Sequence, residues 1–165
     1  MLRGIAVLMT ALMGTGAGFL MAARLKGRRD ALETACGCVS GILLAIAHTN
    51  RALPDILFSL NGPDVVEQTA KRMEEGMLPG DAWEAALREA GNVTALLTGE
   101  DLERLNEFVA VLGKTGRAAQ LEHGQMVLSA LEKRRAGAEE AYAKKGRVYR
   151  TMGAVLGAGL AILLM

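Results

Sequence analysis

The residue types that most often carry chemistry are few in this chain and poorly spaced for it. Cys36 and Cys38 are separated by one glycine, but residues two positions apart on a helix point to nearly opposite sides. They are therefore unable to bind one ion together or readily form a disulfide. His48 and His123 each lack a second ligand three or four residues further along the chain. We predict that the two thiols are small and buried, that His48 packs or ends a helix, and that the chain holds no metal and no cofactor.

Acid–base and nucleophilic catalysis have equally little support. The adjacent acids Glu74-Glu75 and Glu139-Glu140 fit solvated helix faces better than a general acid and its base. The chain has no Walker A, G-x-G-x-x-G or G-x-S-x-G pattern. A small membrane hydrolase is the enzymatic alternative, and it would need a convergent His, Cys or carboxylate site. The sequence therefore predicts a protein that is not an enzyme.

Two apolar segments at the ends of the chain set its organisation. Residues 4–23 carry no charge, and about 20 apolar residues of helix cross a bilayer core. Residues 151–165 are uncharged but shorter, so they cross only if Val148 and Tyr149 join them and Arg150 snorkels. The alternatives are a cleaved secretory signal at the start and a tail lying on the membrane at the end. The prediction is a transmembrane helix over 1–23, a cytoplasmic helical domain over 24–150, and a short transmembrane or membrane-anchoring helix over 151–165.

Basic residues border each apolar segment on the side that faces the middle of the chain. These two basic collars are Arg24, Lys26, Arg28 and Arg29 after the first segment, and Lys144, Lys145, Arg147 and Arg150 before the second. Because positive charge is retained on the cytoplasmic side, the collars predict a cytoplasmic middle with both termini across the membrane. Each Lys or Arg near anionic headgroups contributes about 1 kcal/mol, so we predict that the collars are membrane-surface residues.

The charges are strongly segregated, although the formal net charge is only +1. All 18 acids lie within 30–143 together with 10 of the 19 basic residues, so this part carries −8 and the ends carry +9. An acidic middle repels a phosphate backbone, which argues against nucleic acid as a partner. The lipid bilayer is instead the expected partner of the basic ends.

Small residues recur at helical spacing in both apolar segments. Gly14 and Gly18 lie four apart in the first, and Gly153 and Gly157 lie four apart in the second. Helices in lipid gain no hydrophobic drive to associate, so close backbone approach matters more there. We expect these stripes to pack the two segments together or against a partner.

The middle of the chain predicts helices throughout, because no segment combines β-branched residues with sustained alternation. Thr98 and Asp101 resemble a capping box at one helix start, with Asp in place of the usual Glu. The last helix begins near Arg117 and can continue into the C-terminal segment. The fold class is therefore all-α, an antiparallel helical bundle flanked by the two apolar helices. Its predicted core comprises Trp83, Leu102, Leu105, Phe108, Leu128 and Leu131.

Several short patterns, in this order, resemble one family. They are Leu53-Pro54-Asp55 after the first long helix, Asp81-Ala82-Trp83-Glu84 with Leu87, Asp101-Leu102 with Leu105, Leu112-Gly113-x-Thr115 with Gln120, and Tyr149-Arg150 with Gly153. With the two apolar ends, they make the chain resemble the stage III sporulation protein AB family over almost its whole length. Gly116 stands where the family favours Asp, and Ala45 stands where a Glu is usual, so a role tied to those carboxylates is not carried over.

This resemblance implies a function that the residues alone do not. The family is similar to half of the F-type platform proteins of type II secretion and type IV pili, which are helical and sit in the inner membrane above a cytoplasmic ATPase. It implies a place in a channel between mother cell and forespore during engulfment, in the mother-cell membrane around the forespore. The implied partners are the secretion-type ATPase, stage III sporulation protein AA, and other stage III sporulation membrane proteins, with homo-oligomerisation left open. A generic membrane adaptor or regulator of another assembly is the alternative.

A charged segment from 100 to 120 is the predicted contact with this partner. The segment begins with acids and ends in a glycine-bounded turn that matches the family pattern, and exposed turns often carry interaction surfaces. The predicted partner-binding residues are Glu100, Asp101, Arg104, Glu107, Lys114, Arg117 and Gln120. A solvated helix face followed by an ordinary turn is the alternative.

Overall fold

The computed structural model describes the backbone of residues 2–60, 62–90 and 94–163, and the side chains of 16–60, 62–90, 95–155, 158 and 159. Throughout these ranges the regular elements are helices and none is a strand, which confirms the all-α prediction. They are α1 (Leu2–His48), α2 (Leu53–Ser59), α3 (Asp64–Glu74), α4 (Pro79–Glu89), the 3₁₀ turn η1 (Thr94–Leu96), α5 (Gly99–Val111) and α6 (Arg117–Leu163). Asn61 and Gly91, at which the sequence predicts a turn and a helix end, lie outside the described residues.

The chain divides into two compact units. The first, which we call the paired-helix unit, comprises Met1–Arg29 and Ala136–Met165, and the second, the central unit, comprises Asp30–Arg135. Both basic collars fall in the paired-helix unit. α1 and α6 contribute to both units because nothing breaks either helix, and no proline occurs in either one. The prediction that the last helix runs from Arg117 into the C-terminal segment is confirmed.

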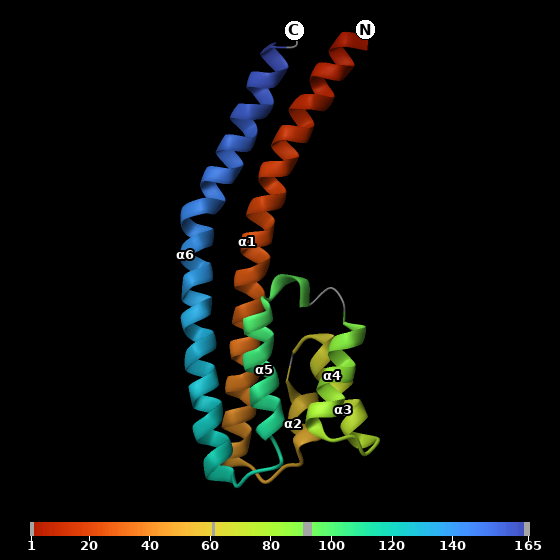
Figure 1. Cartoon of the computed structure of the whole chain (residues 1–165), viewed down its shortest axis with the longest axis vertical. Helices are drawn as coiled ribbons and strands as arrows, with labels where there is room; N and C mark the ends of the chain where they lie inside the picture. Colours follow the sequence, from red (N-terminus) through yellow and green to blue (C-terminus); the bar gives the residue numbers. More distant parts are fainter. Residues whose placement is uncertain (1, 61, 91–93, 164–165) are drawn as a thin grey trace. The chain divides into compact units, whose positions relative to one another are not determined.

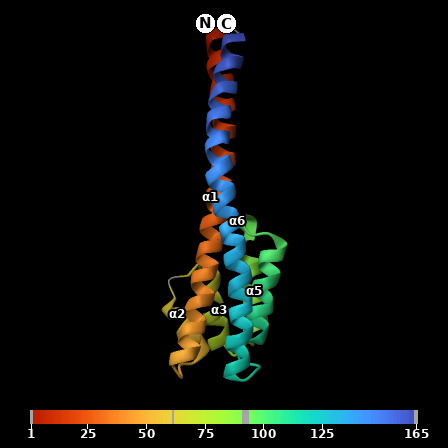
Figure 2. The same ribbon diagram turned by 90° about the vertical axis from the view of Figure 1, so that its left-hand side faces the viewer.

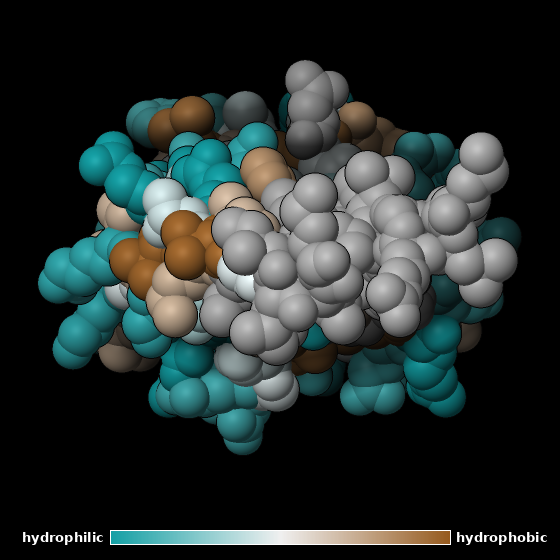
Figure 3. All heavy atoms as spheres, turned by 90° about the horizontal axis from the view of Figure 1, so that it is seen from above, coloured by the Kyte–Doolittle hydropathy of each residue, from teal (hydrophilic) through white to brown (hydrophobic). Residues whose placement is uncertain are grey.

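In the paired-helix unit α1 and α6 lie side by side and antiparallel, as Figures 1 and 2 show from two directions. A Cβ atom built on Gly18 would collide with the carbonyl oxygen of Tyr149 and lie 3.0 Å from the Cα of Gly153. The two backbones therefore meet at Gly18 and Gly153, one glycine of each small-residue stripe, and at this point the two segments pack together as expected. The surroundings of Gly14 and Gly157 lie outside the described residues. Figure 3 looks at the end of the molecule that carries both termini, where apolar side chains appear in brown on its described part.

A second contact fixes the register of the paired helices. The guanidinium of Arg29 lies 5.2 Å from the centroid of the Tyr142 ring, which is cation–π range. Its Nε is 3.5 Å from Oε2 of Glu139. Gly18 thus lies opposite residues 149–153 and Arg29 opposite residues 139–142, so numbers rise along one helix as they fall along the other.

The central unit is built from short helices because proline and glycine punctuate the sequence. Pro54 and Pro79 occupy the first turns of α2 and α4, where a missing N–H costs nothing. α4 therefore begins at Pro79. Gly76 follows α3 with a φ of 95°, a left-handed conformation that L side chains rarely adopt. α3 packs against α2 and α4, and α4 packs against α5.

The core of the central unit joins helices that are far apart in the sequence. Its most buried large side chains include Leu32 and Val39 of α1, Phe108 of α5 and Leu131 of α6. Gly124 of α6 lets that helix approach α1 and α5, since a Cβ there would meet Leu43 and, at 2.9 Å, Phe108. Three residues of the predicted core, Leu105, Phe108 and Leu131, are buried, and the other three, Trp83, Leu102 and Leu128, are half-buried.

Candidate functional site

The start of α5 is held by a capping box, as the sequence predicts. The Thr98 hydroxyl accepts a hydrogen bond from the Asp101 amide at 3.4 Å. In return the Asp101 carboxylate accepts from the Thr98 amide at 2.8 Å and from the Thr98 hydroxyl at 2.6 Å. Two donors at the helix start are thereby satisfied. The negative charge also lies at the positive end of the α5 dipole, where it is favoured.

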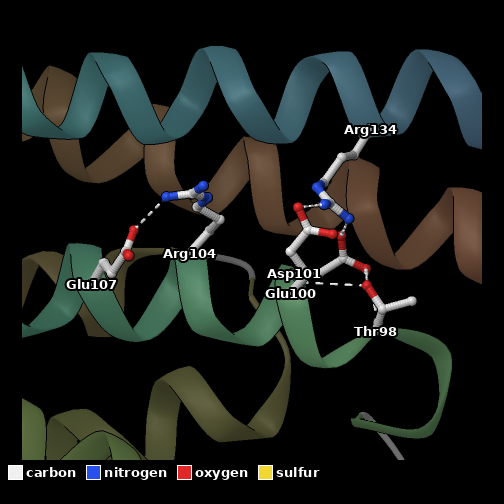
Figure 4. Close-up of polar contacts among 6 residues, drawn as sticks. All are labelled: Thr98, Glu100, Asp101, Arg104, Glu107 and Arg134. Carbon is white, nitrogen blue, oxygen red and sulfur yellow. Dashed lines mark hydrogen bonds and ion pairs between the residues drawn. The ribbon is translucent and has the colours of Figure 1, made fainter.

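Arg134 of α6 completes this cluster (Figure 4). Its Nη1 donates to Oδ1 of Asp101 at 3.0 Å, and its Nη2 pairs with Oε1 of Glu100. The Asp101 side chain has no exposed surface, whereas Arg134 is one-quarter exposed. A buried carboxylate is costly unless it is paired and hydrogen-bonded, so Arg134 is its necessary counter-charge. Asp101 was predicted as a partner contact, but the fold already uses both of its oxygens internally.

The same arginine sets the ionisation of Glu100. The hydrogen bond and charge of Arg134 hold the pKa of the Glu100 carboxyl below its ordinary value, and the bond to Glu100 raises the pKa of Arg134. An acid with a lowered pKa in the folded state stabilises the fold above its unfolded pKa, and this contribution is lost as the pH falls through the lowered value. Glu100 is well exposed, so salt weakens the interaction.

The exposed side of α5 carries further predicted contacts. Arg104 Nη1 lies 2.9 Å from Glu107 Oε2, and both side chains are more than two-fifths exposed. Figure 4 shows this pair further along α5, on the same side as Glu100. Exposed pairs at this spacing contribute little to stability, because water and salt screen them. Glu100, Arg104 and Glu107 therefore form an exposed charged surface, in which the pair of Arg104 and Glu107 adds little to stability.

The predicted partner contacts in the turn between α5 and α6 are of two kinds. Gly113 has a φ of 76°, which turns the chain after α5. Arg117 Nη2 donates to the carbonyl oxygen of Ala47 near the end of α1, and Gln120 Nε2 donates to the carbonyl of Thr115 at 2.6 Å. These two side chains hold the turn, whereas Lys114 is exposed. Gly116 faces open space, so the acid that the family favours there would meet no obstacle.

The predicted membrane-surface residues lie near one another in the paired-helix unit. The register that places Gly18 opposite 149–153 and Arg29 opposite 139–142 sets residues 24–28 beside about 141–145, so the first collar overlaps the start of the second. We call the two collars together the basic belt. Its exposed members are Arg24, Lys26, Lys144, Lys145, Arg147 and Arg150.

Some side chains of the basic belt also form contacts with other residues of the paired-helix unit. Lys144 lies 2.5 Å from Glu140 on its own helix, which lowers the pKa of that carboxyl and raises the pKa of the lysine. Arg150 donates to the carbonyl of Gly146 at 3.1 Å. Arg29 contacts Tyr142 and Glu139, so part of its charge is used to hold the helix pair together.

The residues considered for metal or redox chemistry lie apart. Cys36 is buried and Cys38 half-buried, and desolvation raises the pKa of both thiols, which favours the neutral form. His48 is the last residue of α1, as predicted for a helix-end histidine. The Nε2 atom of His123 is buried without a hydrogen-bond partner among the described residues. Nowhere in the described ranges do three His, Cys, Asp or Glu side chains gather as a metal site requires.

These features define the class of the protein as all-helical with an apolar N-terminal helix. Gly16–His48 of α1 is long and apolar enough to cross a membrane by length and composition. A buried core helix or a signal sequence passes the same test, so this finding is weak support for membrane association. The structure adds the close pairing of α1 with α6 and the basic belt.

Comparison with known proteins gives the family. The family model of stage III sporulation protein AB matches residues 3–165, and this chain therefore belongs to that family. It is similar to stage III sporulation protein AB of Bacillus subtilis (strain 168), with 34% identity over 84 residues. That match covers 51% of this chain and 48% of the relative, so it extends over about half of each protein. No solved structure matches. The family supports a role in sporulation, and it is not a known class of enzymes.

Proposed function

We propose that this chain is a non-catalytic membrane platform component of a secretion-like channel between mother cell and forespore. In this role the central unit lies in the cytoplasm and couples to a secretion-type ATPase, stage III sporulation protein AA. The observation that carries the proposal is the family match over residues 3–165. We infer the platform role and the ATPase partner from the similarity of that family to the F-type platform proteins.

The basic belt supports the membrane part of the proposal. A single membrane surface requires that the two collars lie at the same level, although more than one hundred residues separate them in the sequence. The register of the paired helices supports this arrangement, because the first collar overlaps the start of the second. The apolar segments then run together on one side of the belt, where glycines allow close packing without hydrophobic drive. The positive-inside rule places the central unit on the cytoplasmic side.

This topology is tested by labelling one exposed position from outside the cell. Glu89 is suitable because its side chain is 63% exposed and lies in the central unit. Glu89→Cys, in a chain that also carries Cys36→Ala and Cys38→Ala, should stay unlabelled by a membrane-impermeant maleimide in intact cells. Permeabilised cells should give full labelling, which controls for reactivity. Labelling in intact cells at the permeabilised level would place the central unit outside.

We narrow the proposed partner surface to the side chains that are exposed and do not hold the turn between α5 and α6. These are Glu100, Arg104, Glu107 and Lys114, because Asp101 is buried and the exposed Arg117 and half-buried Gln120 hold the turn. A charged surface of this kind fixes register and speeds association more than it adds affinity. We therefore expect the contact with the ATPase to weaken as salt rises.

Charge reversal on this surface is the direct test of the ATPase contact. Arg104→Glu with Lys114→Glu, in the full chain in lipid nanodiscs, should slow association with the purified ATPase by about tenfold at low salt. Helicity and thermal melting should not change. Surface plasmon resonance at two salt concentrations measures the association rate.

A matched double variant separates this surface from net charge. Lys71→Glu with Arg88→Glu makes the same charge change on α3 and α4. It breaks the exposed pairs with Glu67 and Glu84, whereas the test double breaks the exposed pair of Arg104 with Glu107. It should bind the ATPase like the unchanged chain, apart from a uniform electrostatic effect. Equal slowing by both doubles would refute this surface. If the unchanged chain does not bind the ATPase at all, the platform proposal itself fails.

A further inference from the structure

The central unit contains an apolar pocket that the proposed function does not use. Its volume is about 150 Å³, and side chains of α1 to α5 line it. Its walls include Val39 and Ile42 of α1, Leu57 of α2, Val66 of α3, and Leu105 and Phe108 of α5. Five helices thus line one partly open pocket whose wall is almost entirely hydrocarbon.

The hydroxyl and N–H donors of the few polar side chains in the wall already form hydrogen bonds within the protein. The Thr34 hydroxyl donates to the carbonyl of Asp30 at 2.9 Å, and the Thr69 hydroxyl donates to the carbonyl of Val65 at 2.7 Å. The indole N–H of Trp83 donates to Oδ1 of Asn106 at 2.7 Å. The remaining polar wall group, Cys38, is a weak hydrogen-bond donor. A ligand with an acceptor atom would therefore lose its bond to water and gain none in return.

Size and chemistry together define what fits. An apolar cavity of about 150 Å³ stays dry and accepts a molecule such as benzene. The half-buried walls at Ala35, Met73 and Leu87 leave a route from solvent. We propose that the central unit binds a small, wholly apolar molecule in this pocket, with the size of a single ring or a short alkyl segment. Binding would restore packing contacts that the wall atoms lack when the pocket is empty.

The single tryptophan provides a direct probe, because Trp83 lines the pocket. The full chain in liposomes is titrated with bromobenzene, whose heavy atom quenches tryptophan fluorescence. We expect quenching that saturates, is reversed by benzene and is not reversed by pyridine. Pyridine has the same shape, but its ring nitrogen needs a donor. Quenching that rises linearly without saturation, or reversal by both rings alike, would overturn the proposal.

A pocket-filling variant and its control localise the binding. Ala35→Leu adds a side chain to the wall on α1, whereas Ala110→Leu adds the same atoms to an exposed position on α5 that does not line the pocket. Ala35→Leu should abolish saturable quenching, and Ala110→Leu should retain it. Retention in both, with normal circular dichroism, would place the ligand elsewhere and refute the site. If Ala35→Leu does not fold, the competition between benzene and pyridine in the unchanged chain decides the question.

Discussion

Arg134→Ala should lower the free energy of unfolding of the central unit by about 2 kcal/mol. Removing one partner of a buried ion pair leaves the other charge uncompensated, which typically costs about 3–5 kcal/mol. Asp101 has no exposed surface, so water does not replace the lost guanidinium. It does keep two hydrogen bonds from Thr98, and Arg134 itself is one-quarter exposed, which places the effect below that range. Unfolding in urea, followed by the fluorescence of Trp83, reports on this unit alone.

The neighbouring arginine offers a matched control. Arg135 lies 4.0 Å from Glu33, and both side chains are close to half exposed or more. Arg135→Ala removes the same side chain from the next position of α6, and it should change the free energy of unfolding by less than about 0.5 kcal/mol. Equal losses in the two variants would mean that helix propensity or net charge, rather than the buried carboxylate, determines the result.

Local sequence signals predicted local structure well. The capping box needed only Thr98 and Asp101 at the right spacing, and it formed with Asp in place of Glu. Gly76 follows α3 in the left-handed conformation that a glycine after a helix commonly adopts. The contact between the two small-residue stripes was also predictable, because lipid-facing helices associate through close backbone approach. Each of these inferences depends on residues a few positions apart or on one simple packing rule.

The site was less predictable because its partners are distant in the sequence. Asp101 and Arg134 are 33 residues apart. No residue near Asp101 in the sequence indicates that its side chain will be buried and paired with an arginine of another helix. One signal was present: Arg134 follows Leu131 by three residues on α6, so it lies near the buried face of that helix. The hydrogen bond from Arg117 to the carbonyl oxygen of Ala47 joins residues 70 positions apart, so the periodicity of the sequence does not predict it either. Some charged residues therefore form contacts that hold the fold together and others stay exposed, and the composition of the chain does not distinguish the two groups.

The largest expected effect on the paired-helix unit comes from one glycine. Gly18→Val should separate α1 from α6 and cost about 3 kcal/mol, the upper part of the range for overpacking. The atoms that a Cβ would meet are the carbonyl oxygen of Tyr149 and the Cα of Gly153. Both belong to the backbone, so no side-chain rotation relieves the clash and the helices must move apart.

A second glycine on the same helix makes the test specific. Gly16 faces open space, so Gly16→Val adds the same apolar volume and the same change in helix propensity without a clash. Spin labels at Met21→Cys and Met152→Cys, in a chain with Cys36→Ala and Cys38→Ala, measure the separation of the helices in nanodiscs. Gly18→Val should broaden the distance distribution and shift it to longer values, while Gly16→Val should reproduce the parent distribution. Identical distributions in both variants would mean that α1 and α6 do not pack at Gly18, and the level alignment of the two collars would then lose one of its two supports.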